Sequence, residues 1–280
     1  MLRVVSGFSL PGAVFLTDGE RAVLAHGQGV EVWKASRVGT DLPLLRGLAA
    51  LWATLRDSWK AMGLLPETRG ITPLEALLAA LLTLLLLPVP LALGLVLPMR
   101  VADALLDRQT QPFLYYALFE ALSLAGLLAY FRLLVLLPPF RSLLRYHGAE
   151  HMVVHLLERG LPLTLEEARR QSPYHPRCGT AFLGMSFLLA VLFYGLFLPL
   201  PEGNPLLFLG LKLGLLPLLV GVSYELFRLM PRVPALMALG LFLQRFTVER
   251  PGDEELEVAL KAARELVGRG DLAHGPEPSS

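Results

Sequence analysis

The chain has 280 residues, of which 54% are hydrophobic and 18% are charged, and its mean hydropathy is +0.55. This composition is too apolar for an ordinary soluble domain and predicts a membrane protein. The net charge of +1 argues against the extended basic surface of a nucleic-acid-binding protein, so no nucleic-acid partner is expected. The single cysteine permits no internal disulfide, which leaves Cys178 as a free thiol or a metal ligand.

Residues 1–40 are expected to form a small cytoplasmic β unit, because β-branched residues recur in short runs there. Asp18-Gly19 separates two apolar runs, which is typical of a two-residue hairpin turn. His26 lies among glycines and is interpreted as a turn residue. Residues 1–10 hold no long apolar core, so no cleavable signal peptide is expected.

Residues 41–72 are predicted to hold an amphipathic helix that lies on the membrane surface. Large apolar residues recur on one side at helical spacing, and cations beside them are available for lipid headgroups. The apolar set is Leu48, Leu51, Trp52, Leu55 and Trp59, and the cations are Arg46, Arg56 and Lys60.

The region 73–250 is predicted to be a transmembrane domain, which makes the fold class a mainly α, polytopic membrane protein. Four apolar stretches are each near the length of a membrane-crossing helix, at about 74–98, 113–131, 180–200 and 205–224. The shorter stretch 236–246 is expected to be re-entrant or interfacial. Beyond this region, 251–269 is predicted to be an amphipathic helix and 270–280 a disordered tail.

The distribution of arginine predicts the orientation of these spans. The segment 140–180, between the second and third spans, carries six arginines, whereas the first connection has two and the last has no basic residue at 201–204. By the positive-inside tendency, both termini and the segment 140–180 are expected on the cytoplasmic side of a bacterial inner membrane. The six are Arg141, Arg145, Arg159, Arg169, Arg170 and Arg177.

The segment 140–180 concentrates residues that bind transition metals. His147 and His151 are one helical turn apart, and with Glu150 they spell His-x-x-Glu-His, the inverted form of a zinc-peptidase signature. In that signature the imidazoles hold the metal, and the carboxylate takes a proton from the attacking water. His155 and Glu158 continue the same helix face and are further candidates.

A second pair of candidate ligands, His175 and Cys178, follows in a loop. Their two-residue gap is short enough for both side chains to bind one ion. Two linked pairs favour a metal site, with zinc or another divalent transition metal, over a polar network without one. Glu225, at the cytoplasmic end of the fourth span, is another candidate ligand.

Two charged residues fall inside the predicted spans. Glu120 lies seven residues into the second span and Lys212 seven into the fourth, and both are counted from the outer side. At about 1.5 Å of rise per residue they reach similar depths, so they could pair. A structural helix contact is favoured over a role in transport, because an isolated charge in lipid is costly.

Several segments resemble, in order, the motifs of a bacterial membrane family catalogued as domain of unknown function 1385, the YqhQ-like proteins. The resemblance covers about residues 40–267. It implies a polytopic bacterial inner-membrane protein with a metal-dependent activity and names no substrate. This chain lacks the glutamate of the family's amino-terminal element at residues 7–14. The matching segments are 43–47 (PLLRG), 146–151 (YHGAEH), 175–180 (HPRCGT), 221–225 (GVSYE), 243–247 (LQRFT) and 249–251 (ERP).

Three hypotheses remain open at this stage. The first is a zinc-dependent, peptidase-like hydrolase in which His147 and His151 bind the metal, Glu150 is the general base, and Glu225 or the loop pair completes the ligand set. The second is a closed structural zinc site that makes the chain a scaffold or a module for a protein partner. The third is a transporter that uses Glu120 and Lys212. The expected partners are the lipid bilayer and an unknown substrate or protein.

Overall fold

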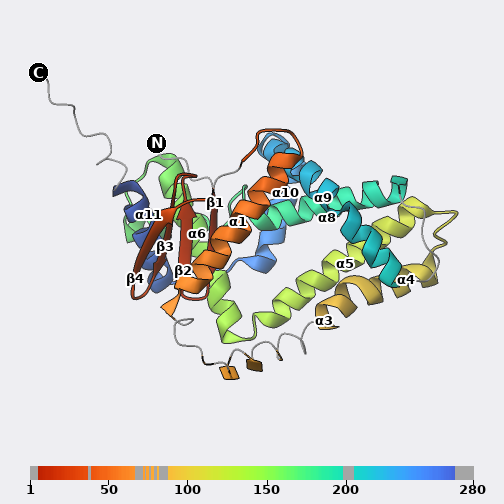
Figure 1. The fold of residues 1–280 in the computed structure, drawn as a ribbon, viewed down its shortest axis with the longest axis horizontal. Coiled ribbons are helices and arrows are strands. Elements are labelled where there is room, and N and C mark those ends of the chain that lie inside the picture. Colours follow the sequence, from red (N-terminus) through yellow and green to blue (C-terminus); the bar gives the residue numbers. More distant parts are fainter. Residues whose placement is uncertain are drawn as a thin grey trace, which may run out of the picture.

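The computed structural model describes residues 6–36, 39–66, 88–197 and 205–268, together with isolated positions between 72 and 81. Figure 1 shows a small sheet with α6 (Pro138–Arg159) and α11 (Asp253–Gly268) at one end. α1 (Leu45–Leu64) lies beside the sheet, and the other long helices extend toward the opposite end. The protein is therefore mainly helical with a small amino-terminal β sheet, as the composition and patterning predicted.

The sheet is antiparallel and has the strand order β1 (Ser6–Leu10), β2 (Ala13–Thr17), β3 (Arg21–His26) and β4 (Gly29–Lys34). The predicted hairpin is the β2–β3 pair, but its loop is longer than two residues. Asp18 Oδ1 accepts hydrogen bonds from the backbone N–H groups of Glu20 (2.9 Å) and Arg21 (2.7 Å), which stabilises a wider turn. His26 is the last residue of β3 and is buried, so the expectation of a turn residue was wrong.

Both faces of the sheet are covered. Val14, Leu16 and Val23 pack against the apolar faces of α6 and α11. Phe15 and Leu24 pack on the opposite side with residues at the end of α1 (Leu45–Leu64). Because successive strand residues point to opposite faces, burial on both sides explains why β2 is apolar at every position but its last.

Among the described residues, three helical stretches are long and apolar enough to cross a membrane, which indicates a membrane protein. The first, Pro88–Leu105, joins α3 (Pro88–Leu91), the π-helical turn η2 (Ala92–Val96) and α4 (Leu97–Leu105). The second is α5 (Pro112–Leu134). The third, Leu209–Arg232, runs through α9 (Pro205–Leu229) into η3 (Met230–Arg232).

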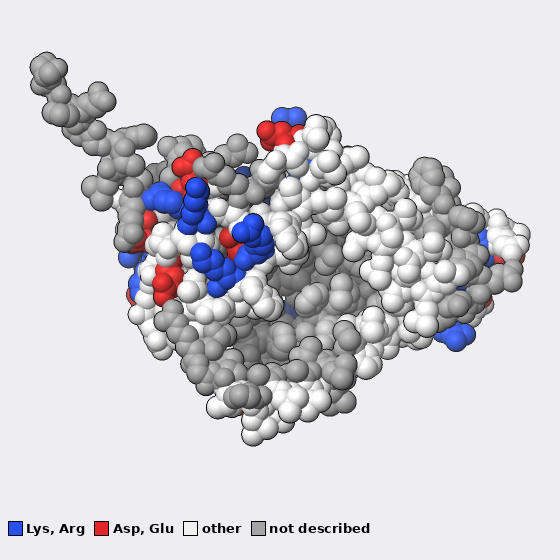
Figure 2. Space-filling model, in the orientation of Figure 1, with Lys and Arg blue, Asp and Glu red and all other residues white. Residues whose placement is uncertain are grey.

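These stretches agree with the four predicted spans only in part. The first lies nearer the carboxyl end than the predicted 74–98, part of which is outside the described residues. The predicted third span corresponds to α8 (Gly179–Phe197), whose described apolar part, Gly179–Tyr194, is shorter than a full span. Figure 2 shows charged side chains over the sheet end, beside the start of α1 and at the far tip, with a broad, nearly uncharged surface between them.

The remaining helices follow their local signals. Thr164 Oγ1 accepts a hydrogen bond from the backbone N–H of Glu167 and so caps α7 (Leu165–Arg169), as the capping box predicted. α10 (Pro234–Thr247) packs against α8, and α11 buries the predicted apolar stripe. The predicted tail, 270–280, lies outside the described residues.

α1 turns its small residues inward and its large apolar residues outward. Gly47, Ala53 and Ala61 are buried, whereas Trp52 and Trp59 are exposed. This arrangement agrees with the predicted surface helix, because the outward face is the apolar one.

Candidate metal centre

The candidate centre is built on α6, which brings its histidines onto one face. The helix begins at Pro138-Pro139 and ends at Arg159, where Gly160 adopts the left-handed conformation (φ 64°) of a glycine cap. His147, His151 and His155 follow one another at four-residue intervals, so their side chains form a stripe along the helix. The predicted stop signals and the predicted face are both observed.

The segment 172–178, which leads into α8, lies opposite this stripe. Its position is maintained by Gln244 near the end of α10, a fully buried side chain. The Gln244 Oε1 atom accepts from the backbone N–H of His175, and its Nε2 donates to the carbonyl oxygen of His175, each at 2.9 Å. One amide thereby satisfies both backbone groups of a loop residue and fixes the loop against α10.

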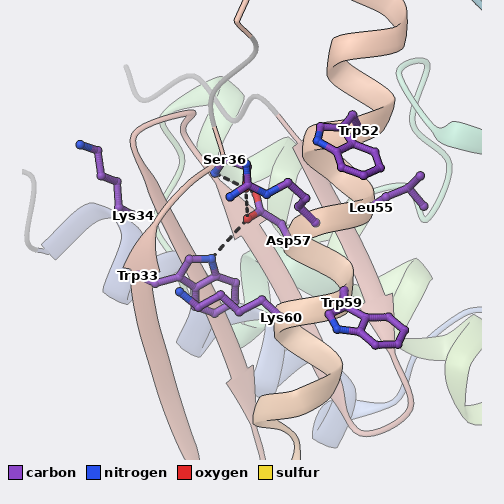
Figure 3. A pocket seen from close by; sticks show the side chains of 9 residues that line it. Trp33, Lys34, Ser36, Trp52, Leu55, Asp57, Trp59 and Lys60 are labelled. Atoms are coloured by element: carbon purple, nitrogen blue, oxygen red, sulfur yellow. Dashed lines mark hydrogen bonds between the residues drawn. The ribbon is translucent and has the colours of Figure 1, made fainter.

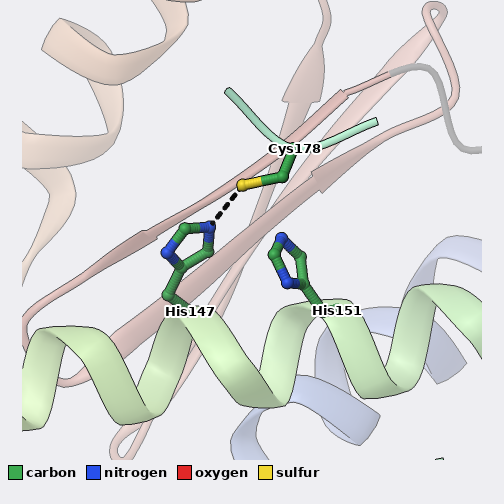
Figure 4. A group of neighbouring side chains, drawn as sticks. All are labelled: His147, His151 and Cys178. Atoms are coloured by element: carbon green, nitrogen blue, oxygen red, sulfur yellow. Dashed lines mark hydrogen bonds between the residues drawn. The ribbon is translucent and has the colours of Figure 1, made fainter. Parts of the chain in front are cut away.

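His147, His151 and Cys178 form the first group of candidate ligands (Figure 4). Each can offer one ligand atom, and these atoms all lie within 4.8 Å of one another. The Nε2 atom of His147 is 3.3 Å from Cys178 Sγ. With metal–nitrogen and metal–sulfur bonds of about 2.0 and 2.3 Å, neighbouring ligands of a tetrahedral ion lie about 3.5 Å apart. The group therefore fits a transition metal with small adjustments.

The tautomers of both imidazoles suit metal binding. The Nδ1 of His147 lies 3.0 Å from the carbonyl oxygen of Thr247, and the Nδ1 of His151 lies 2.7 Å from that of Pro173. A carbonyl oxygen can only accept, so each Nδ1 carries the proton and each Nε2 keeps its lone pair. Burial lowers the pKa of His151 well below its usual value, which keeps that ligand neutral. This outer-shell pattern is common at histidine metal sites.

Cys178 directly precedes α8 and is buried. Burial raises the pKa of its thiol, while the N–H of Thr180, which points at Sγ from 3.4 Å, opposes that rise. In the metal-free protein the thiol can donate to the free Nε2 of His147. A bound cation would displace that proton, because thiolate is the form that ligates metals.

Glu150 is adjacent to His151 but is not part of the group of candidate ligands. Its Oε2 atom is 3.9 Å from His151 Nε2, and β1 covers the carboxylate so closely that a Cβ at Gly7 would lie 2.3 Å from Oε1. Burial raises the pKa of Glu150 to about 7, although a charged His147 would lower it. A carboxyl group with this pKa can accept and release a proton near neutral pH.

The second group, His155, Glu158 and His175, is arranged as a hydrogen-bonded network. His175 Nδ1 accepts from the backbone N–H of Arg177, and its Nε2 donates to Glu158 Oε2 (3.2 Å for each). Glu158 also binds the Arg177 guanidinium, and His155 Nε2 donates to the carbonyl oxygen of Tyr174. Both nitrogens of His175 are thus engaged. The structure does not meet the expectation that His175 and Cys178 share one ion, because His175 turns toward Glu158.

Glu225 lies in a different environment from the one expected of a ligand. Arg46 binds its carboxylate in a two-pronged ion pair, with Arg46 Nε 2.7 Å from Oε1, and the backbone N–H of Leu44 donates to the same oxygen. Among the described residues, neither group of candidate ligands includes Glu225. These contacts join the start of α1 to the end of α9, and the structure does not bring Glu225 together with the candidate ligands that the sequence grouped with it.

Glu120 and Lys212 bind each other, as their depths predicted. Lys212 Nζ donates to Glu120 Oε1 at 2.7 Å and also lies 4.5 Å from the ring centroid of Phe119. The pair joins α5 to α9 and neutralises both charges inside the apolar region. This contact is the structural arrangement that the cost of an isolated intramembrane charge favours.

Sequence reasoning assigned no role to several residues that position the ligands. Gly148 is one example, because a Cβ there would lie 2.2 Å from the carbonyl oxygen of Glu249. The missing side chain lets the segment after α10 approach α6, which brings the Thr247 carbonyl to His147. The segments 243–247 and 249–251 are among the matching family motifs. Their side chains alone suggest no role, because it is the backbone carbonyl groups of Thr247 and Glu249 that lie against α6.

The fold and the centre together define a membrane protein with a buried His/Cys group beside a carboxylate. Residues 42–269 match the family described as Protein of unknown function (DUF1385), and the chain belongs to this family. It is similar to the uncharacterized protein YqhQ of Bacillus subtilis (strain 168), with 30% identity over 250 residues, 81% of this chain and 77% of that protein. No solved structure matches.

Proposed function

We propose that this protein is a metal-dependent hydrolase that acts at the cytoplasmic face of a bacterial inner membrane. The observation that carries this proposal is the convergence of His147, His151 and Cys178 within 4.8 Å, with Glu150 3.9 Å from the lone-pair nitrogen of His151. Three protein ligands and an adjacent carboxylate are the usual components of a catalytic zinc site.

The donor set of two imidazoles and one thiolate suits zinc best and also accepts other divalent transition metals. Such an ion supplies Lewis-acid activation of water and of a carbonyl or phosphoryl oxygen when it is bound. Thr247 and Pro173 keep the two imidazoles oriented through their carbonyl oxygens. The protein thus holds the ligand nitrogens in place before any ion arrives.

Glu150 is proposed to move the proton. It would accept a proton from water as the water oxygen bonds to the carbonyl carbon or phosphorus of the substrate. It would then return that proton to the leaving group as the original bond breaks, so that one water is consumed. A pKa of about 7 suits both transfers, because the carboxyl group is neither strongly acidic nor permanently protonated.

The cytoplasmic placement is supported by the arginines between the second and third predicted spans. Arg159 and Arg170 lie on the same segment as the candidate ligands, and Arg177 immediately precedes Cys178. Positively charged connections are retained on the cytoplasmic side. The ligand group would then open toward the cytoplasm and the inner leaflet.

A closed structural metal site is the second candidate, and burial favours it. His151 is 3% exposed, Cys178 4% and Glu150 6%, so little room is left for an open position. Glu150 lies outside the group and would have to turn toward it to serve as a fourth ligand. In that case the metal would join α6 to the start of α8, and the protein would act as a scaffold or partner-binding module.

Both candidate functions require a metal ion at His147, His151 and Cys178, and metal analysis of the purified protein tests this requirement. His147→Ala removes one ligand and should lower zinc affinity by more than about 100-fold, since even outer-shell changes cost about 10–100-fold. His155→Ala is the matched control. It also removes an imidazole from α6, one turn beyond His151, but this imidazole belongs to the second group and should not affect zinc binding. Equal zinc binding by the two variants would exclude the site.

Cobalt substitution separates the two candidates without a known substrate. Cobalt bound at this centre should show a sulfur-to-metal charge-transfer band that Cys178→Ser removes. Azide should shift the visible spectrum if a coordination position is open, and should leave it unchanged if the site is closed. With p-nitrophenyl acetate or bis-p-nitrophenyl phosphate as probes, Glu150→Gln should lower turnover about 10²–10⁴-fold while zinc is retained. Loss of zinc in Glu150→Gln would instead identify a fourth ligand.

A further inference from the structure

A surface cleft of about 540 Å³ lies between β4 and α1, remote in sequence from the metal group. Its lining includes Trp33, Trp52 and Trp59, which are all of the tryptophans in the chain. Three cations also line it: Lys34, Arg56 and Lys60. We call this feature the tryptophan cleft. Its volume lies within the range of about 300–1,000 Å³ that is typical of small-ligand sites.

The inner wall of the tryptophan cleft is a fixed polar contact between the sheet and α1 (Figure 3). Asp57 is buried and accepts three hydrogen bonds, from Trp33 Nε1 (3.4 Å), the backbone N–H of Ser36 (3.2 Å) and Ser36 Oγ (2.9 Å). Among the described residues that line the cleft, Asp57 is the only acidic one, and its carboxylate is used in these internal hydrogen bonds. Three cations against this one carboxylate leave the cleft with a positive charge.

The outer wall is apolar and faces outward. Trp52, Leu55 and Trp59 lie along one side of α1 (Figure 3), and they are 65%, 53% and 78% exposed. Tryptophan is costly to leave in water, but it is enriched where a membrane meets water, since its ring is apolar and its N–H is polar. An exposed row of this kind indicates a surface that another phase or molecule covers.

The start of α1 is attached to a membrane-crossing helix. Arg46 pairs with Glu225 near the end of the stretch Leu209–Arg232, and Gly47 lets α1 approach that helix, because a Cβ there would lie 2.6 Å from Tyr224 Cβ. α1 thus begins at the level where this span ends. Trp52 and Trp59 follow on α1 about two and about four turns further on.

We propose that the tryptophan cleft binds the headgroup of an anionic phospholipid of the surrounding leaflet. Arg56 and Lys60 would donate to the phosphate oxygens, while Trp52 and Trp59 would lie among the upper acyl-chain carbons. Lys60 Nζ is 5.2 Å from the ring centroid of Trp33, which orients the ammonium group across the cleft. A lipid fits better than a soluble anion, because a soluble anion would leave the exposed tryptophan row uncovered.

Tryptophan fluorescence reports on this cleft alone, since no other tryptophan exists in the chain. The full-length protein is placed in phosphatidylcholine nanodiscs that contain an equal mole fraction of either dibrominated phosphatidylglycerol or dibrominated phosphatidylcholine. Bromine quenches only on contact, so excess quenching by the phosphatidylglycerol measures lipid selectivity. Each cation near an anionic leaflet changes the binding constant by about fivefold. Arg56→Gln/Lys60→Gln should therefore reduce the selectivity by up to about 25-fold, toward unity.

The matched control is Arg170→Gln/Lys261→Gln, which removes the same charges from exposed sites elsewhere and should retain the selectivity. An unchanged emission maximum in pure phosphatidylcholine shows that the cleft variant is folded. Equal quenching by the two brominated lipids in the unmodified protein would overturn the proposal. Equal loss in both double variants would also overturn it, since the effect would then be one of net charge. If inorganic phosphate abolishes the selectivity at physiological concentration, the site belongs to a soluble anion instead.

Discussion

Replacement of Glu150 by glutamine should change how the stability of the metal-free protein depends on pH. The native pKa of Glu150 is raised from 4.5 to about 7 by burial under β1. Between these values the folded state holds a proton that the unfolded state has released, so stability falls as pH rises through this window. At about 1.4 kcal/mol for each tenfold change in proton affinity, the loss reaches about 3 kcal/mol above pH 7.

Glutamine keeps the shape of the side chain but cannot ionise. Glu150→Gln and the unmodified protein should therefore be similarly stable near about pH 5, where the native carboxyl group is neutral. Near about pH 8 the variant should be more stable by up to about 3 kcal/mol. Buried histidines such as His151 titrate in the opposite direction, because burial lowers their pKa. They are present in both proteins, so the difference between the two isolates Glu150.

The assay is urea unfolding in a neutral detergent with a strong chelator, followed by tryptophan fluorescence. The tryptophans report on the packing of α1 against the sheet whose β1 strand covers Glu150. Glu257→Gln, an exposed site on α11, is the control and should give a difference that does not vary with pH. A pH-independent difference for Glu150→Gln as well would refute the buried, proton-retaining carboxyl group.

Three further substitutions test the packing around the centre and between the spans, each measured by unfolding in detergent. Gly148→Ala brings a Cβ within 2.2 Å of a backbone oxygen, and it should cost about 1–3 kcal/mol and weaken zinc binding; unchanged stability would contradict the close approach. Gln244→Leu leaves the backbone N–H and carbonyl of His175 without their buried partner, and it should cost about 2–4 kcal/mol. Lys212→Met alone should lower the free energy of unfolding by about 3–5 kcal/mol, because it leaves the Glu120 carboxylate buried without its partner. Addition of Glu120→Gln should recover part of that loss, whereas additive costs of the two substitutions would show that the charges do not interact.

Local signals predicted much of the fold. α6 ends at Gly160 because glycine adopts the left-handed conformation at little cost, and α7 starts where Thr164 caps it. The four-residue spacing of His147 and His151 places both on one face of any helix that contains them. These features depend on residues a few positions apart, so the sequence alone contains the information.

The set of candidate ligands, in contrast, depends on long-range packing. Cys178 reaches His147 only because Gln244 fixes the loop before α8, and the short spacing of His175 and Cys178 does not reveal that their side chains diverge. The same limit applies to Glu225, which Arg46 binds from a helix far away in the sequence. Spacing along a chain constrains neighbours within one element and says little about which elements meet.

The sequence by itself determined that this is an apolar, helical chain in which side chains of the types that can bind metals are gathered in one interval. The tertiary structure decided which of them meet, and it buried Glu150 by laying β1 across α6 at Gly7. The physical reason is that helix periodicity and caps act over a few residues. A carboxyl group acquires an altered proton affinity only when distant segments exclude water from it.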